Sequence, residues 1–376
     1  MVLIALFGAI GGLIQPTKRR ATMTIDFISD TVTRPTGQML EAMMSARVGD
    51  DVFNEDPEAK ALQVYAAELF GHEAALFMPS GVMSNQIAIK AHTEPMDELI
   101  CEESSHVFRY ENGGYAFHSQ IAIQTIPGDY GRLTAEQIQR AIKPVADWLP
   151  RSRLIVLENT CNAAGGSFYT LDRVRPIREL SRARGLRLHL DGARLFNALV
   201  ESGEATLDWG REFDSISICL SKGLGAPVGS LLIGSREFIA KARRLRKGFG
   251  GGMRQIGFLA AAGLYALQNH IERLREDHEH ARILAATLAG APFVAAMRPV
   301  HTNILIFDLA GELPADVFLA RLADNGIRAH AFGPQTIRFV THLDISRPMI
   351  ERVIRVLGAM NALGKVGNLR EAMPQT

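Results

Sequence analysis

Residues 215–230 read SISICLSKGLGAPVGS, and this stretch places one lysine, Lys222, just beyond a short apolar run. The run at 215–220 is typical of a buried strand, and the glycines and proline that follow it prevent the strand from continuing. We therefore expect Lys222 at the end of a strand. Glycine-rich backbone would partly desolvate its ammonium group, which favours the neutral amine that forms Schiff bases. A surface lysine beside a loop is the alternative interpretation.

Two more apolar stretches, 153–158 and 186–191, precede this strand at intervals of roughly 30 residues, with helical sequence between them. This spacing predicts βαβ units, and hence an α/β fold. Because ligands bind at the carboxyl ends of strands in open α/β sheets, we expect Glu158, Asp191 and Lys222 to share one edge of the sheet. The alternative for Asp191 is a structural ion pair with Arg194.

An anion site is predicted where residues 74–78, an apolar strand, lead through Pro79, Ser80 and Gly81 into a helix that starts near Val82. The N–H groups at a helix N-terminus have no partner within the helix, and they bind anions such as phosphate. An ordinary helix capped by serine fits the same residues.

The composition indicates a globular protein that acts on small molecules. The chain has 376 residues, 47% of them hydrophobic and 22% charged, which fits two domains better than one. Its net charge of +1 provides no basic surface for nucleic acid. The three cysteines lie far apart without metal-ligand spacing, which argues against a disulfide framework or a zinc site and favours a reducing, cytoplasmic compartment.

The N-terminal stretch carries an apolar run at 2–14 that is short for a membrane span and lacks the pattern of a signal peptide. We interpret residues 1–22 as a non-native or disordered extension, with Met23 as the working initiator. A weak export or anchor segment is the alternative.

The rest of the chain is divided by changes in its hydrophobic pattern. We expect an N-terminal arm at 23–36, a large domain at 37–272, and a smaller C-terminal α+β domain at 273–376, where strand, helix and strand patterns follow one another. In the helix expected at 274–288, His278 and His280 point to different faces, so we interpret both as exposed rather than metal-binding.

A lysine, an acid and an anion site at one sheet edge match the needs of pyridoxal 5'-phosphate. The lysine forms the Schiff base, the carboxylate of Asp191 keeps the pyridine nitrogen protonated, and the helix N-terminus binds the phosphate. Dinucleotide binding is a weaker alternative. The glycines at 223, 225 and 229 depart from GxGxxG by one residue, and no GxxxxGK[ST] motif occurs.

Six segments resemble those of the low-specificity L-threonine aldolases, over about residues 26 to 363. They are PSGVMSNQ at 79–86, ENTCNAAGG at 158–166, HLDGARLFNA at 189–198, CLSKGLGAPVGS at 219–230, GGGMRQ at 250–255 and IRFVTH at 337–342. The resemblance implies the aspartate-aminotransferase-like fold type I of pyridoxal phosphate enzymes, with a mixed, mostly parallel sheet. It also implies homotetramers whose active sites lie at dimer interfaces.

The activity implied is the cleavage of L-threonine, L-allo-threonine and related β-hydroxy-α-amino acids to glycine and an aldehyde. Two alternatives stay open. One is β-elimination or racemisation with the same cofactor, and the other is a non-catalytic scaffold protein that binds pyridoxal phosphate.

The resemblance also implies roles for individual residues around the cofactor. Lys222 matches the Schiff-base lysine, Asp191 the partner of the ring nitrogen, and His106 the ring that stacks on the cofactor and acts in proton transfer. Ser80, Gly81 and Val82 match the phosphate turn, and Arg254 matches an arginine that reaches the phosphate from a neighbouring subunit. Without the resemblance, His106 would be interpreted as a loop histidine with no role.

The resemblance further implies that Ser29, Arg194 and Arg338 hold the substrate carboxylate, a task that suits guanidinium groups because they bind carboxylates in a bidentate manner. Cys161 stands where many members carry a histidine near the substrate hydroxyl. A neutral thiol is a weak hydrogen-bond partner, so we expect poor threo/erythro discrimination and tolerance of bulkier β-substituents. The alternative is that Cys161 is a packing residue. Val82 replaces a threonine, at a cost of about 1 kcal/mol for one lost hydrogen bond.

Overall fold

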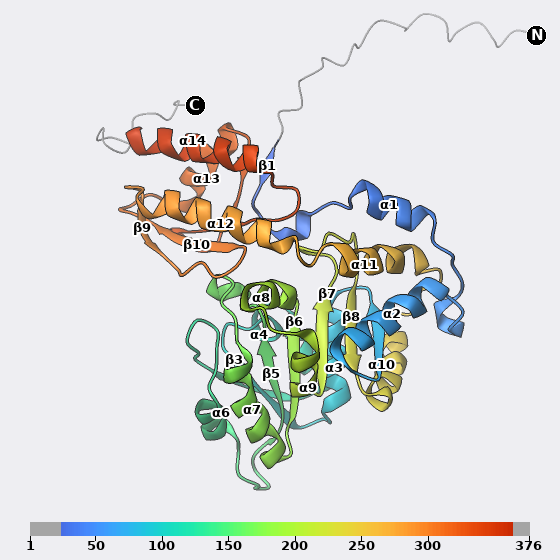
Figure 1. Cartoon of the computed structure of the whole chain (residues 1–376). Helices are drawn as coiled ribbons and strands as arrows, with labels where there is room; N and C mark the ends of the chain where they lie inside the picture. The colour runs from blue at the N-terminus through green and yellow to red at the C-terminus, as the bar shows by residue number, and fades with distance from the viewer. Residues whose placement is uncertain (1–23, 364–376) are drawn as a thin grey trace, which may run out of the picture.

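The computed structural model describes residues 24–363, so the extension expected at 1–22 lies outside the described residues. The larger part of the molecule is built around a seven-stranded sheet. A four-stranded sheet lies beside it, packed with the C-terminal helices (Figure 1). In the part of the chain that the structure describes, no helix is long and apolar enough to cross a membrane.

The large sheet has the strand order β2-β8-β7-β6-β5-β3-β4. Its strands are β2 (Ala74–Met78), β3 (Asp97–Glu102), β4 (Ala122–Ile126), β5 (Arg151–Glu158), β6 (Arg187–Gly192), β7 (Ser215–Cys219) and β8 (Ser230–Gly234). Strand β8 runs antiparallel to β2 and β7, and the other neighbours are parallel. The expected mixed, mostly parallel sheet is confirmed.

Helices cover both faces of this sheet, as expected when parallel strands are joined by crossovers. The helices of this part of the chain are α1 (Gly37–Met44), α2 (Pro57–Phe70), α3 (Gly81–His92), α4 (His106–Arg109), α5 (Gly114–Ser119), α6 (Ala135–Ala141), α7 (Leu171–Arg184), α8 (Leu195–Ser202), α9 (Thr206–Glu212), α10 (Arg236–Gly248) and α11 (Gly257–Asn269), of which α1 packs on α11.

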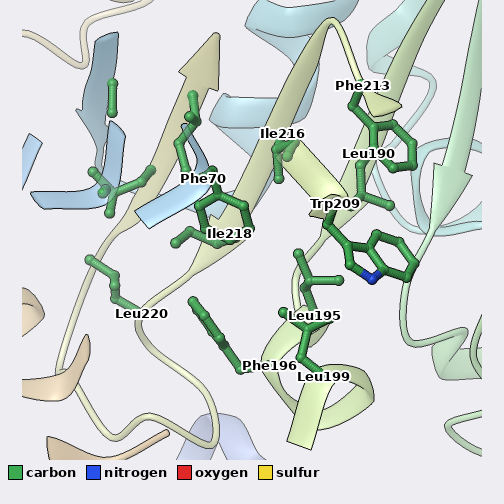
Figure 2. Close-up of a cluster of buried hydrophobic side chains, with 14 of the residues drawn as sticks. Phe70, Leu190, Leu195, Phe196, Leu199, Trp209, Phe213, Ile216, Ile218 and Leu220 are labelled. Atoms are coloured by element: carbon green, nitrogen blue, oxygen red, sulfur yellow. The ribbon is translucent and has the colours of Figure 1, made fainter. Parts of the chain in front are cut away.

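Strands β6 and β7 present opposite chemistry on their two faces. Leu190, Ile216 and Ile218 point into an apolar cluster with Phe196 of α8 and Trp209 of α9 (Figure 2). Side chains alternate along a strand, so the residues between these apolar positions face the other way, toward α3. Those residues are polar, and they include Asp191.

The C-terminal part consists of α12 (Leu274–Ala289), β9 (Val294–Met297), β10 (Ile304–Leu309), α13 (Ala315–Asp324), β11 (Ile327–Arg328), β12 (His330–Ala331), β13 (Thr336–Val340) and α14 (Arg347–Leu363). The predicted arm joins this part, because β1 (Ile25–Asp26) pairs in parallel with β11. Phe27 of the arm stacks on Phe339 with their ring centroids 5.1 Å apart. The arm therefore contributes to the C-terminal core.

The predicted exposure of His278 and His280 is wrong. Both are buried, with 0% and 8% of their surface exposed, because α12 packs between α8 and α14. His278 Nδ1 lies 2.9 Å from Glu201 Oε2, and Asn197 Nδ2 lies 3.1 Å from His278 Nε2. The histidine therefore links α12 to α8.

Candidate active site

A cavity of about 250 Å³ lies where β2, β3, β6 and β7 are followed by their loops. Its walls include six of the residues expected to bind the cofactor, namely Ser80, Gly81, Val82, His106, Asp191 and Lys222. The strand-end argument and the family motifs therefore converge on one cavity. Lys222 lies three residues beyond the end of β7, as expected.

The N-terminus of α3 forms one wall of this cavity. Ser80 is the N-cap, and its Oγ accepts a hydrogen bond of 3.2 Å from Met83 N–H. The next N–H groups, of Gly81 and Val82, lie in the first turn, where backbone donors have no acceptor within the helix. A Cβ at Gly81 would approach Cys219 Sγ to 2.6 Å, so only glycine fits this close contact. Ser80 therefore caps the helix while the neighbouring donors remain available for an anion.

Asp191 is buried beneath the cavity, at the end of β6. Its Oδ2 accepts a 2.9 Å hydrogen bond from Asn85 Nδ2 of α3, and its Oδ1 accepts one of 3.2 Å from Ala193 N–H. Arg194 makes its ion pair with Asp30 instead, so the alternative in which Asp191 serves as the ion-pair partner of Arg194 is wrong.

His106 is held by Glu111, a residue that the sequence did not single out. His106 Nδ1 lies 2.9 Å from Glu111 Oε1, and Glu111 also accepts hydrogen bonds from Asn85 (2.8 Å) and Gln86 (2.5 Å). One side-chain atom each of His106, Glu111 and Asp191 lies within 4.8 Å of the other two. Burial lowers the pKa of His106, but the Glu111 hydrogen bond and nearby carboxylates outweigh it and raise that pKa.

Glu158, at the end of β5, connects the backbone at His106 to the loop that carries Asn162. Its carboxylate accepts hydrogen bonds from the backbone N–H of His106 (2.7 Å) and of Asn162 (2.9 Å). Burial, followed by the negative charge of Asp191, raises the pKa of Glu158 to about 7. The charge on Glu158 therefore changes with pH near neutrality.

The two arginines expected to hold a carboxylate lie close together. Arg194 donates two hydrogen bonds of 2.7 Å to Asp30, and Arg338 Nη1 donates one of 3.1 Å to Asn162 Oδ1. Arg194 Nη1 lies 3.5 Å from the same oxygen. Both guanidinium groups thus meet at Asn162.

The charges around this arginine pair favour an added anion. Burial opposes ionisation of Asp30, yet Arg194 holds the pKa of Asp30 well below its usual range, with a smaller effect of Lys222. Arg338 has no such carboxylate partner among the described residues, and burial and the charge of Arg194 lower its pKa. Within residues 24–363 its buried Nε has no hydrogen-bond acceptor. Ser29, whose Oγ lies 3.4 Å from Asp30 Oδ1, belongs to the same group.

Cys161 is not brought to the cavity. It is 3% exposed and lies in the apolar core, with its Sγ 3.2 Å from Glu158 O and 3.4 Å from Gly131 O. Burial, followed by the charge of Glu158, raises the pKa of its thiol well above the usual value. This placement fits the packing alternative.

Arg254 also lies away from the cavity of its own chain. Its side chain is 53% exposed and donates a 2.8 Å hydrogen bond to Asp50 Oδ2. The guanidinium lies 5.8 Å from the ring centroid of Phe53, which is itself exposed. The two side chains form an exposed group outside the cavity.

An amine, a buried carboxylate and a helix N-terminus around one cavity, at the strand ends of a mixed α/β sheet, define an enzyme of the pyridoxal phosphate class. Within that class, the chain belongs to the β-eliminating lyase family, whose model matches residues 26–312. The expected family resemblance is thereby confirmed.

Curated relatives cover nearly the whole chain. It is 44% identical over 330 residues to a low specificity L-threonine aldolase of Escherichia coli (strain K12), across 88% of this chain and 97% of that protein. It is 40% identical to low-specificity L-threonine aldolase 1 of Arabidopsis thaliana, across 86% of this chain and 92% of that protein.

Solved structures share the fold. A threonine aldolase of Leishmania major matches with a TM-score of 0.78 at 23% identity, over 90% of this chain and 99% of that one. Serine palmitoyltransferase of Sphingomonas wittichii matches with a TM-score of 0.72 at 16% identity, over 91% of this chain and 88% of that one. The fold class expected from the sequence is confirmed.

Proposed function

We propose that this chain is a pyridoxal-5'-phosphate-dependent aldolase that cleaves L-threonine, L-allo-threonine and related β-hydroxy-α-amino acids to glycine and an aldehyde. The observation that carries the proposal is the convergence of Lys222, Asp191 and the N-terminus of α3 on one cavity. The threonine aldolases among the curated relatives support the choice of substrate.

The residues around the cavity fit the cofactor. Lys222 supplies the amine for covalent attachment, the first-turn N–H groups of α3 and the close packing at Gly81 suit a phosphate, and Asp191 suits a protonated ring nitrogen. When bound, pyridoxal phosphate accepts the electron pair that is left on the α-carbon after the carbon–carbon bond breaks.

The arginine pair fits the substrate carboxylate. Arg338 has a buried Nε without an acceptor among the described residues, and Asn162 holds its Nη1 beside Arg194. A carboxylate bound here would relieve the repulsion between the two cations. Asp30 accepts from two nitrogens of Arg194, and Asn162 Oδ1 and Ile28 O accept from two of Arg338. Among the described residues, the Nε of Arg338 is therefore the buried guanidinium donor of this pair that lacks an acceptor.

Glu111 and His106 fit the proton transfer. Glu111 accepts the Nδ1–H of His106, which leaves Nε2 as the ring atom that can take a proton from the β-hydroxyl, directly or through one water. The buried carboxylate fixes the ring orientation and raises the basicity of Nε2. We therefore assign the base role to His106 rather than to Cys161.

The proposal is tested by product analysis. Purified protein reconstituted with pyridoxal phosphate is incubated with L-threonine and with L-allo-threonine, and Lys222→Ala protein serves as the matched control. Acetaldehyde and glycine in equal amounts from wild type only are the expected result. Ammonia with 2-oxobutanoate would indicate β-elimination, inversion at the α-carbon would indicate racemisation, and cofactor binding without any product would indicate a scaffold.

We further propose that the enzyme acts as a cytoplasmic homotetramer in which Arg254 serves the site of a neighbouring subunit. The exposure of Arg254 and Phe53 outside their own cavity supports this arrangement, and three buried free thiols suit a reducing compartment. Mixing inactive Lys222→Ala and Arg254→Ala subunits should restore part of the activity. If each site were built from one chain, the mixture would stay inactive.

A further inference from the structure

A continuous chain of polar side chains crosses the face of the large sheet that is covered by α3. His189 and Asp191 alternate with Leu190 on β6, and their register partners on β7 are Ser215 and Ser217. Each of these four polar residues is buried. Neither the family motifs nor the strand-end argument gives His189 or Ser215 a role.

The direction of the hydrogen bonds at Asn85 is fixed by its partners. Its Nδ2 contacts Glu111 Oε1 at 2.8 Å and Asp191 Oδ2 at 2.9 Å, and carboxylates only accept. The amide must therefore direct its nitrogen to the acids and its Oδ1 to the sheet. That oxygen lies 2.7 Å from Ser217 Oγ and 3.3 Å from His189 Nε2, and both of these groups must donate to it.

The contact with Asn85 Oδ1 assigns the tautomer of His189. Burial lowers the pKa of His189 to about 4, against the opposing effects of the Asp191 charge and of a hydrogen bond with the Ser215 backbone, so the ring is neutral. We assign its single proton to Nε2, the ring atom that faces Asn85 Oδ1. Its Nδ1 must then accept, and the donor is Ser215 Oγ at 2.8 Å. Ser215 has given its only proton away, so it accepts in turn from His92 Nε2 at 2.7 Å. His92 is also neutral, because burial lowers its pKa to about 3.

Every donor in this chain of polar side chains therefore points the same way. The hydrogen bonds run from His92 through Ser215, His189 and Asn85 to the carboxylate of Asp191. His92 lines a second cavity, of about 440 Å³, whose other walls include Arg187 and Lys241. The chain thus runs from the edge of that cavity to the floor of the active site. Hydrogen bonds aligned in series polarise one another, and the last link gains most because its acceptor is charged.

We propose that His189 is a positioning residue for the reaction, which acts through Asn85 to hold the carboxylate of Asp191 in its orientation toward the cofactor ring nitrogen. Ser215 and His92 hold His189 in the Nε2–H tautomer that this role requires. The proposal rests on the proposed function, because that function gives Asp191 its ring partner. The chain supports the ion without adding a second charge to the buried site.

Neutron diffraction from crystals of the deuterium-exchanged wild-type protein, with and without pyridoxal phosphate, tests the hydrogen-bond direction itself. We expect deuterons on Nε2 of His189 and of His92 and none on their Nδ1 atoms, in both forms. A deuteron on Nδ1 of His189, or a doubly protonated ring, would overturn the inference. This result does not depend on activity, so it stands even where the product analysis fails.

Two substitutions of His189 separate positioning from packing. His189→Gln keeps an amide N–H that can reach Asn85 Oδ1, whereas the shorter His189→Asn loses that donor. For His189→Asn we expect kcat to fall and the dissociation constant of pyridoxal phosphate to rise, each by about 10- to 100-fold, as for the loss of a hydrogen bond that supports a charged group. The KM for threonine should change little, because the arginine pair is untouched.

The Gln variant should recover most of the lost kcat and cofactor affinity. His280→Asn, which removes another buried histidine, on α12, is the matched control and should leave both quantities at the wild-type level. Equal losses in the Gln and Asn variants, or a loss confined to thermal stability, would show that His189 only fills space. If neither variant folds, Ser215→Ala provides a smaller change that removes the donor to Nδ1 of His189; it should lower kcat and cofactor affinity in the same direction as His189→Asn, and unchanged values would overturn the proposal.

Discussion

Replacing Asp30 by asparagine tests how the fold holds the substrate arginine. Asp30 and Arg194 form a bidentate ion pair with two hydrogen bonds of 2.7 Å, and their side chains are 0% and 5% exposed. Removing one member of a buried pair leaves the other charge without compensation, which costs about 3 to 5 kcal/mol. We expect Asp30→Asn to lower the free energy of unfolding by that amount at pH 7.

The measurement is urea unfolding of wild type, Asp30→Asn, Arg194→Met and the double variant, at one protein concentration and followed by tryptophan fluorescence. The double variant should be more stable than Asp30→Asn, because methionine removes the unpaired charge while it fills similar space. A loss below about 1 kcal/mol in Asp30→Asn, or a double variant that is less stable than either single one, would refute the reasoning.

The difference in unfolding free energy between wild type and Asp30→Asn should also depend on pH, which provides an independent check. The folded-state pKa of Asp30 lies below its ordinary value of 3.8, so its ionised form stabilises the fold above that pH. The contribution is lost as the pH falls through the folded pKa. The stability difference between wild type and Asp30→Asn should therefore stay constant from pH 8 to about pH 5 and shrink in more acidic solution.

Three further results are expected at the site. Lys222→Ala should abolish the visible absorbance of the covalently bound cofactor and leave the far-UV circular dichroism unchanged, and full activity in this variant would contradict the assignment of the site. Asp191→Asn should keep the absorbance and lose most of kcat. Glu111→Gln should move the acidic limb of the kcat/KM profile to lower pH, because His106 loses the hydrogen bond that raises its pKa and keeps the burial that lowers it; an unmoved limb would assign the titration elsewhere. Cys161→Ala should leave the ratio of kcat/KM for threonine, allo-threonine and phenylserine unchanged at a stability cost of about 1 kcal/mol, and a changed ratio would restore a substrate contact for Cys161.

Most strands of the large sheet could be predicted because their apolar runs end at strong turn signals. Strand β2 occupies the residues 74–78 that the sequence indicates, and β5, β6 and β7 differ from their predicted bounds by two residues or fewer. Strand β8 was not predicted. Its run SLLIG follows the glycine-rich loop directly, and only the pairing with β2 and β7 distinguishes it from a continuation of that loop.

Some residues of the candidate site could likewise be predicted from the sequence, and others could not. Asp191 and Lys222 could be found because strand ends in an α/β sheet meet at one edge, a property of topology that spacing reveals. Glu111 could not, because it contacts His106 only through the turn between α4 and α5. For Cys161, the sequence shows which residue type stands in the loop, but the direction of its side chain depends on the backbone around Gly131, which no local pattern specifies.

Alternation along β6 and β7 ties the stability of the fold to the chemistry of the site. Leu190, Ile216 and Ile218 fill the apolar cluster on one face, and a shift of either strand by one residue would move these side chains to the polar face (Figure 2). The same shift would carry Asp191 into the core, away from Asn85. The hydrophobic core therefore fixes the register that aligns the polar chain, and burial of that chain keeps both of its histidines neutral. The carboxylate of Asp191 can then be held in place through neutral donors, and the opposite face of the same strands supplies the packing that holds those donors in place.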